Sequence, residues 1–356
     1  MNIRLQHSKI SPESICIVII ERDFVLGSVS VADLFERSGL HTATLLLNGD
    51  ILVTGGVNEG NCLSRSEIYS PLSNTWTLVA NMSIARELHT ATRLLDGRVL
   101  ITGGNNCSSP THYCEVFDPS PATWLSIPNM NYRRVFHRAT LLSNGSVLVT
   151  GGLSGGSYTN VVEIYDPIAN TWSTVRSMNQ ARGLHTATLL PNGEVLVVGG
   201  FNGVSVHSSL EAYNPDTDTW SNIGNMAQPR YHHATTLASN ETVLISGGAD
   251  SSIVSSVLRY DVASRSLTTA SSMNVARIQH TQTVLNNSLV LVIGGTNGLL
   301  GLSSMEAYNP LANTWTSGAN IQVGRTEHTA TLLPTGQVLI TGGYDGFNYL
   351  SSAELI

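Results

Sequence analysis

Charge is the scarcest property of this chain. Only 12% of its 356 residues are aspartate, glutamate, lysine or arginine, and lysine occurs once, at Lys9. The net charge of −7 argues against nucleic acid or an anionic membrane surface as a partner, because both are themselves negatively charged. Long apolar runs are also missing, since none approaches the ~18–20 residues that cross a bilayer. We therefore expect no transmembrane segment and no nucleic-acid or membrane partner.

Cysteine is scarce as well, and four cysteines in a chain of this length do not form a disulfide framework. Cys107 and Cys114 bracket one predicted loop, so they either form a disulfide in an oxidising compartment or remain two thiols. The N-terminal apolar run covers only residues 15–20, which is shorter than the roughly 7–15 residues in the core of a signal peptide. We expect residues 1–21 to be an N-terminal tail or an extra edge strand, and we favour a cytoplasmic location.

What the sequence has in abundance is repetition. Seven Gly-Gly pairs end apolar runs and begin at residues 55, 103, 151, 199, 247, 294 and 342, so the period is 47 or 48 residues. A period of this length indicates a repeat architecture in which each copy is one structural unit. A histidine stands 14 residues before each pair, at His41, His89, His137, His185, His233, His280 and His328.

Each copy predicts four strands. A Thr- and Leu-rich segment such as HTATLL, a tight Asn-Gly or Asp-Gly turn and an apolar segment such as VLVVGG predict a hairpin. A Glu-x-aromatic step with alternating polarity predicts the third strand, and a tryptophan seven residues later begins the fourth. The fifth copy departs from this pattern, with Leu258 for the glutamate and Leu267 for the tryptophan. The five tryptophans all occupy the repeated position: Trp76, Trp124, Trp172, Trp220 and Trp315.

The diglycine, the Glu-x-Tyr step and the spaced tryptophan resemble kelch repeats. The segment HTATLLPNGEVLVVGG is similar to the type of kelch repeat found in galactose-oxidase-like propellers. The resemblance covers roughly residues 28–356. It implies an all-β fold, a seven-bladed β-propeller of kelch repeats with four antiparallel strands in each blade.

The seventh copy, which begins near His328, stops after its third strand and lacks a tryptophan strand. A blade left open in this way would expose a sheet edge, which proteins avoid. Counting back from His41 aligns residues 28–34 with the fourth strand of the other copies. We therefore expect an N-terminal strand to close the last blade, and a single propeller domain over residues 22–356.

We interpret the repeated glycines and histidines as architecture. No helical pattern follows any diglycine, as a phosphate-binding loop would require, and one histidine per blade does not converge on a single metal ion. A repeated arginine leaves two interpretations open. It pairs with the glutamate of the Glu-x-Tyr step as a structural residue, or, as the kelch resemblance implies, it belongs to a ring that holds acidic peptides. These arginines are Arg86, Arg134, Arg182, Arg230, Arg277 and Arg325.

The segments before each histidine and after each diglycine differ between copies. On a repeated scaffold, such variable loops usually carry binding specificity. Aromatic residues in them are candidate anchors because aromatic side chains dominate binding hot spots, while packing within their own loops is an equally supported alternative. The candidates are Phe136, Tyr158, Phe201, Tyr231, His232, Phe347 and Tyr349.

We therefore expect a monomeric, non-enzymatic scaffold that binds a protein or peptide on one loop face, with no catalytic residue, cofactor or metal. The alternatives are a copper-radical oxidoreductase of the galactose or glyoxal oxidase type and a carbohydrate-binding propeller. The resemblance implies that a copper-radical site needs a cysteine-crosslinked tyrosine, a second tyrosine and two histidines, and no motif places these on numbered positions. The nearest approach to the Asp box of sialidase-type propellers, residues 216–220, lacks the required glycine.

Overall fold

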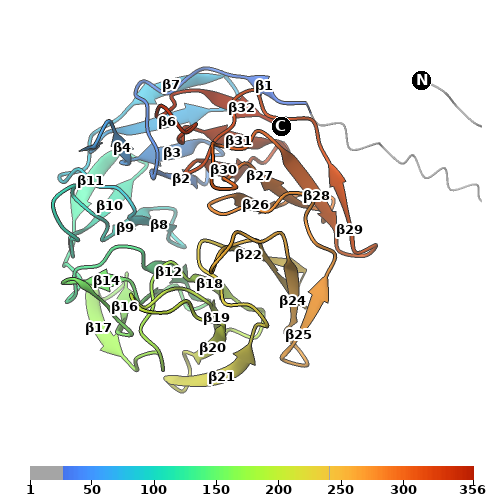
Figure 1. Ribbon diagram of the computed structural model, residues 1–356. Helices are drawn as coiled ribbons and strands as arrows, with labels where there is room; N and C mark the ends of the chain where they lie inside the picture. The colour runs from blue at the N-terminus through green and yellow to red at the C-terminus, as the bar shows by residue number, and fades with distance from the viewer. Residues whose placement is uncertain (1–26, 240) are drawn as a thin grey trace, which may run out of the picture.

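The computed structural model describes residues 27–239 and 241–356, and this part of the chain is built of strands without a helix (Figure 1). Seven four-stranded antiparallel sheets stand around one axis, so the predicted seven-bladed propeller is confirmed. We number the blades 1 to 7 in the chain order of their first strands. Within the described ranges no helix is long and apolar enough to cross a bilayer. The tail or edge strand expected over residues 1–21, and the predicted domain start at residue 22, lie outside the described residues.

The first two strands of each blade form the hairpin nearest the axis. The first strands are β2 (Thr42–Leu45), β8 (Thr90–Arg93), β12 (Arg138–Leu141), β18 (Thr186–Leu189), β22 (Ala234–Ser239), β26 (Thr281–Val284) and β30 (Thr329–Leu332). The second strands are β3 (Ile51–Thr54), β9 (Val99–Thr102), β13 (Val147–Thr150), β19 (Val195–Val198), β23 (Thr242–Ser246), β27 (Val290–Ile293) and β31 (Val338–Thr341).

The two outer strands complete each sheet, and two short hairpins extend the second-to-third loops of blades 1 and 3. The third strands are β6 (Ser66–Ser70), β10 (Cys114–Asp118), β16 (Val162–Asp166), β20 (Ser209–Asn214), β24 (Val257–Asp261), β28 (Met305–Asn309) and β32 (Ala353–Leu355). The fourth strands are β7 (Thr75–Leu78), β11 (Thr123–Ser126), β17 (Thr171–Val175), β21 (Thr219–Asn225), β25 (Ser266–Ala270), β29 (Thr314–Ser317) and, in blade 7, β1 (Val29–Ser30). The short hairpins are β4 (Val57–Asn58) with β5 (Asn61–Cys62), and β14 (Leu153–Ser154) with β15 (Ser157–Tyr158).

Blade 7 contains both ends of the described chain. In Figure 1 the strand β1 lies beside β32, and the register sets Val29 opposite Leu355 and Ser30 opposite Glu354. The amide of Val31 extends this pairing by donating to the carbonyl of Ala353 at 3.1 Å. The predicted closure by an N-terminal strand is therefore confirmed.

The apolar core lies between the blades. The second strands are buried along their whole length in six blades and over four of five residues in blade 5, because each blade packs both of its faces against neighbours. One core cluster, for example, joins Ile51 and Tyr69 of blade 1 to Leu339 of blade 7. Because packing between blades constrains the strand residues, the loops are the part of the scaffold whose sequence is free to vary.

In five blades the repeated tryptophan links the blade to the one before it. The indole packs on the aromatic residue of the third strand, with ring centroids 5.0 to 5.1 Å apart. Its Nε1 donates to a backbone carbonyl of the preceding blade, as Trp124 does to Ala80 at 2.7 Å. Leu267 cannot make this bond, so blade 5 is fastened differently: Arg265 reaches Ser221 and Glu194 of blade 4.

Candidate functional site

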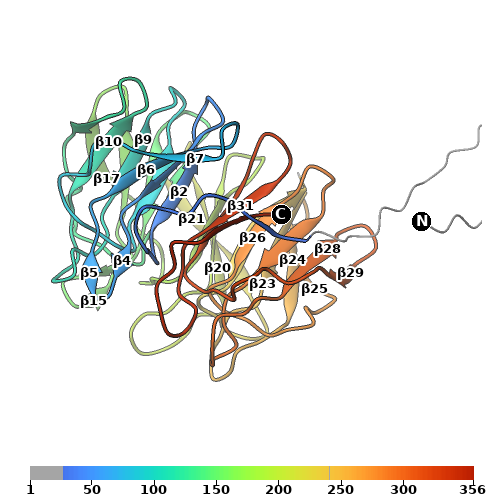
Figure 2. The ribbon, with the colours of Figure 1, turned by 90° about the horizontal axis from the view of Figure 1, so that it is seen from above.

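Two kinds of loop meet on one face of the propeller, which we call the loop face. The segment that precedes each first strand pairs with the segment that follows each diglycine, as in the bridges Gly39–Val57, Gly183–Phe201 and Tyr231–Ala249. In Figure 2 the strands β4, β5 and β15, which belong to the post-diglycine loops of blades 1 and 3, lie together at the same edge of the propeller. The variable segments of the sequence are therefore neighbours in space.

The six repeated arginines point into the protein instead of onto this face. Each is at most 1% exposed, and its Nη1 donates to the carbonyl of the first glycine of the pair at 2.6 to 3.0 Å. In five blades Nη2 binds the glutamate of the Glu-x-aromatic step at 2.5 to 2.8 Å, the structural partner that the sequence suggested. A buried guanidinium must be paired, because an isolated buried charge is costly. The expectation that an arginine ring belongs to the binding surface is therefore corrected for Arg86, Arg134, Arg182, Arg230, Arg277 and Arg325.

Blades 5 and 1 show what happens when one partner of the pair is missing. In blade 5 Leu258 replaces the glutamate, and among the described residues Arg230 donates to Gly247 and Ser256 alone. Burial lowers the pKa of Arg230 to about 10. In blade 1 Ser38 replaces the arginine and its hydroxyl donates to the carbonyl of Gly55. Burial then raises the pKa of Glu67, which keeps a hydrogen bond from the amide of Phe35.

The seven histidines join neighbouring blades. In five of them Nε2 contacts the threonine that begins the first strand of the preceding blade, as in His89 with Thr42 at 3.0 Å and His233 with Thr186 at 2.9 Å. All seven are buried, and desolvation lowers the pKa of His41 to about 4 and that of His280 to about 3. These imidazoles are therefore neutral near pH 7 and act as hydrogen-bonding links.

The residue immediately before each of these histidines has a left-handed backbone, with φ between 53° and 60°. This conformation is rare for residues other than glycine and costs free energy, so surrounding contacts must maintain it. Part of the support is a belt of hydrogen bonds: Leu88, for example, donates its amide to the carbonyl of Leu40 in the preceding blade at 3.2 Å. We call these seven residues the mouth ring: Leu40, Leu88, Phe136, Leu184, His232, Gln279 and Glu327.

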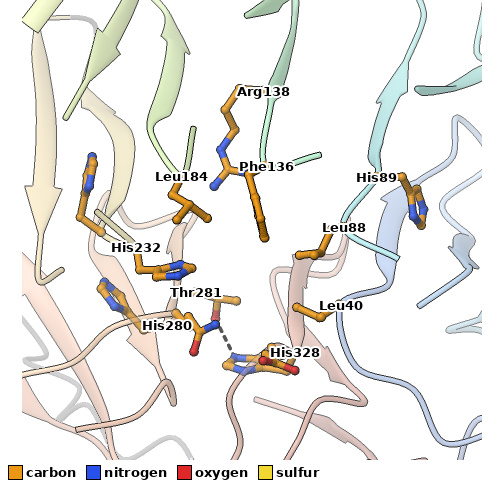
Figure 3. Close-up of a pocket in the computed structure, with 13 residues that line it drawn as sticks. Leu40, Leu88, His89, Phe136, Arg138, Leu184, His232, His280, Thr281 and His328 are labelled. Atoms are coloured by element: carbon orange, nitrogen blue, oxygen red, sulfur yellow. Dashed lines mark hydrogen bonds between the residues drawn. The ribbon is translucent and has the colours of Figure 1, made fainter. Parts of the chain in front are cut away.

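The mouth ring surrounds a cavity of about 270 Å³ at the centre of the propeller. Figure 3 shows Leu40, Leu88, Phe136 and Leu184 converging on it from four blades, with His232 on a neighbouring side. Arg138, the first residue of β12, also lines the cavity. One wall is thus apolar, and the other, from blades 5 to 7, carries the polar side chains of the ring.

An aromatic cluster crosses blades 3 to 5 beside this cavity. Tyr158 meets Phe201 edge to face at 5.4 Å between ring centroids, Phe201 lies 6.1 Å from Tyr231, and Tyr231 lies 5.0 Å from His232. All four side chains are partly exposed. The structure therefore brings together four of the predicted candidates from three blades, and Phe136 joins them at the cavity.

Glycine at two positions makes room for tyrosines of the preceding blade. A Cβ built on Gly183 would lie 2.7 Å from the Tyr158 ring, and one on Gly39 would lie 2.8 Å from the Tyr349 ring. Tyr349 lies tilted against Tyr344 of blade 7, with 5.1 Å between ring centroids, a contact that the sequence did not predict; Phe347 is 73% exposed. Tyr344 and Tyr349 thus form a second aromatic pair on the loop face, away from the cluster of blades 3 to 5.

The blade 1–2 side of the face contains a disulfide and a carboxylate. Cys62 of β5 is bonded to Cys107, with 5.6 Å between Cα atoms. Neither predicted alternative for Cys107 and Cys114 is therefore correct: Cys114 begins β10 inside the core, whereas Cys107 faces Cys62 across the blade boundary. Burial raises the pKa of the Cys114 thiol to about 12. Glu87 lies beside the disulfide and accepts a hydrogen bond from Asn105 at 3.0 Å.

The donor atoms of the loop face do not fit the copper-radical site implied by the galactose-oxidase resemblance. The central cavity is lined by His232 and four of the buried histidines, but by no tyrosine or cysteine of the described chain. The three ligand-type groups that converge elsewhere among the described residues are Cys62, Glu87 and Cys107, and both cysteines are in the disulfide.

Leu40 and Arg138 line the cavity but were not singled out from the sequence. The mouth-ring residues Leu88, Leu184, Gln279 and Glu327 lie in the variable segments that the sequence marked before the repeated histidines, although they were not among the aromatic anchor candidates. A signal for Arg138 was present, because the third copy reads HRAT where four other copies read HTAT.

Comparison with known proteins agrees with the architecture. The family model described as the KLHDC2/KLHL20/DRC7 Kelch-repeats domain matches residues 40–248 and 184–353. Among solved structures, a novel fungal alcohol oxidase of the AA5 family, in complex with copper, is similar with a TM-score of 0.76. It is 17% identical, and the match covers 92% of this chain and 75% of that one, which shows a common fold. No curated protein matches the sequence.

Proposed function

The chain belongs to the kelch-repeat β-propellers, and on that basis we propose that it is a non-enzymatic, monomeric scaffold that binds a protein or peptide on its loop face. The proposed contact surface is the aromatic cluster of Tyr158, Phe201, Tyr231 and His232, extended by Phe136 at the cavity. A fold alone does not imply a function, so the proposal rests on this cluster.

The observation that carries the proposal is the continuity of the cluster across blade boundaries. Tyr158, Phe201 and Tyr231 come from three blades, yet their rings form one connected and partly exposed surface. Aromatic side chains of this kind supply large contact areas at a small cost in conformational entropy. Packing on Gly183 holds the Tyr158 ring in place, which reduces the entropy lost on binding.

Charge favours a partner with apolar anchors over an acidic one. The six repeated arginines are buried, and the loop face contributes Glu87 and Glu327 near Tyr349. A peptide with aromatic or aliphatic anchors for the cluster fits this surface, and a basic residue fits its acidic side.

A selection from a displayed peptide library on the purified protein tests the proposal. We expect enriched peptides to lose at least tenfold in affinity on the double variant Phe201→Ser/Tyr231→Ser, because truncating buried aromatic anchors costs more than 1 kcal/mol each. Ile168→Ser is the matched control, since this 94% exposed residue lies in a turn between third and fourth strands, on the opposite face.

Both variants are first checked for an unchanged melting temperature. Peptides that bind the double variant as tightly as the unaltered protein would contradict the proposed surface. Equal loss in Ile168→Ser would show that the effect is not specific to the loop face.

A further inference from the structure

Arg138 occupies a position at which the repeat has another residue. The first strand begins with threonine in five blades, and each of these threonines contacts the histidine of the next blade. In blade 3 Arg138 replaces this threonine, and His185 contacts Thr150 of the second strand at 2.9 Å, a contact that His41, His89 and His137 make in addition to the first-strand one. Ala234 of blade 5 omits the same bond with a small apolar side chain, whereas Arg138 sets a long charged side chain at this position, which indicates a role outside the architecture.

The guanidinium of Arg138 is only partly used by the protein. Its Nε donates to the carbonyl of His185 at 2.9 Å, and within the described chain this is its single hydrogen bond, with no ion pair. The side chain is exposed to the cavity, and in Figure 3 it extends from β12 toward Phe136 and the cavity centre. The walls around it lower the pKa of Arg138, but a guanidinium remains charged at neutral pH. Its two Nη groups are therefore available to an anion.

The other titratable groups of the cavity do not compete for this role. Desolvation lowers the pKa of His232 to about 4 and that of His89 and His280 to about 3, and lowers those of His233 and His328 well below the ordinary value. All five rings are neutral near pH 7. Glu327 belongs to blade 7, across the ring from blade 3, and burial raises the pKa of its carboxyl. Arg138 is thus the cation of a cavity whose histidines carry no charge.

The walls beside Arg138 indicate what accompanies the anion. Phe136 and Leu184 flank it, and Leu40 and Leu88 continue the apolar wall around the mouth ring. A volume of about 270 Å³ holds a small organic molecule, and an apolar wall with a few placed polar groups is the usual composition of such sites. A planar carboxylate matches the fork of an arginine in a bidentate pair.

We propose that the central cavity binds a small organic carboxylate, with its carboxylate on the Nη atoms of Arg138 and its apolar body against Phe136 and Leu184. The polar side of the mouth ring, His232 and Gln279, then faces any hydroxyl or amide group of the ligand. This site shares Phe136 and His232 with the proposed peptide-binding surface, but it needs no macromolecular partner, so binding of a small carboxylate is tested separately from peptide binding.

Calorimetric titration with phenylacetate tests the site, and 2-phenylethanol, which has the same ring but no charge, is the matched probe. We expect saturable 1:1 binding of phenylacetate and at least tenfold weaker binding of 2-phenylethanol. The variant Arg138→Thr restores the residue found in five other blades, so it should fold and should weaken phenylacetate at least tenfold. Arg138→Lys keeps the positive charge but not the planar fork of the guanidinium. Its affinity for phenylacetate should lie between that of the unaltered protein and that of Arg138→Thr.

Two results would overturn the proposal. The first is a failure of Arg138 to matter: either phenylacetate shows no saturable binding to the unaltered protein, or it binds Arg138→Thr equally well. In the latter case the carboxylate does not use Arg138. The second is inorganic phosphate binding as tightly as phenylacetate and equally well in Phe136→Ala, which would leave an anion site without an organic body. A loss of phenylacetate binding in Phe136→Ala, with the melting temperature unchanged, would support it.

Discussion

At the scale of single residues, the repeated arginine and glutamate form buried ion pairs in five blades. Arg134 and Glu163 are both fully buried, with 2.6 Å between Nη2 and the carboxylate oxygen, and the same arginine holds two backbone carbonyls. Each pair therefore links the segment before a first strand to the diglycine turn and the third strand of its blade. Because both charges are removed from water, losing one partner leaves the other uncompensated.

We expect Glu163→Gln to lower the free energy of unfolding by about 3 kcal/mol, because Arg134 loses its counter-charge in the interior. Urea unfolding followed by fluorescence measures the loss. Glu194→Gln is the control: its pair with Arg265 is 3.4 Å long and partly exposed, so the change should cost less than about 1 kcal/mol. Equal losses in the two variants would show that burial does not determine the value of the pair.

At the scale of elements, the propeller depends on a short N-terminal segment. The strand β1 is only two residues long, yet the segment that follows it supplies Ala32, whose carbonyl accepts a bond from Trp76, and Leu34, which is buried in the cluster between blades 7 and 1. The disulfide between Cys62 and Cys107 likewise ties a loop of blade 1 to a loop of blade 2. Closure of the ring is thus maintained by side chains next to the strand as well as by strand pairing.

Leu34→Ala should lower the free energy of unfolding by about 2–3 kcal/mol, because it opens a cavity in the cluster that joins the first and last blades. Its neighbour Phe35 is 56% exposed, so Phe35→Ala should change stability by no more than about 0.5 kcal/mol. Thermal unfolding measures the melting temperatures of both variants, which are compared with that of the unaltered protein. If the two variants melt at the same temperature, Leu34 does not contribute to closing the ring.

At the scale of the whole molecule, seven neutral histidines make stability dependent on pH. The pKa is about 4 for His41 and about 3 for His89 in the folded chain, against about 6.5 for a solvated histidine. Between these limits the unfolded chain binds protons that the folded chain does not, so stability falls as the pH falls. Two carboxyls act in the opposite sense, since burial raises the pKa of Glu67 and of Glu327, but they are outnumbered.

We therefore expect the urea midpoint to decrease steeply from pH 6.5 toward pH 4.5, with each histidine contributing up to about 1.4 kcal/mol per pH unit. His280→Gln should make the dependence shallower by about one proton, because its neutral ring no longer distinguishes the folded from the unfolded chain. A midpoint that is the same at pH 7.5 and pH 5 would be incompatible with buried neutral histidines.

The period, the number of blades and the closing strand were predictable from the sequence alone. These features follow from local signals: the turn residues, the alternation of polar and apolar residues, and the avoidance of open sheet edges. Because the signals recur from copy to copy, the repeat made them easy to recognise. The glutamate partner of the repeated arginine was also predictable, since both residues recur and blade 5, which keeps the arginine, lacks the glutamate.

The candidate site depended on contacts that tertiary structure alone decides. Which cysteine faces Cys107, whether Tyr158 reaches Phe201 of the next blade and where Arg138 points all depend on how side chains of different blades meet. The burial that turns six arginines into structural residues, and leaves the guanidinium of Arg138 open to the cavity, arises only when seven similar sheets close around one axis. A pattern within one copy determines a blade, whereas the packing between copies determines which charges remain available to a ligand.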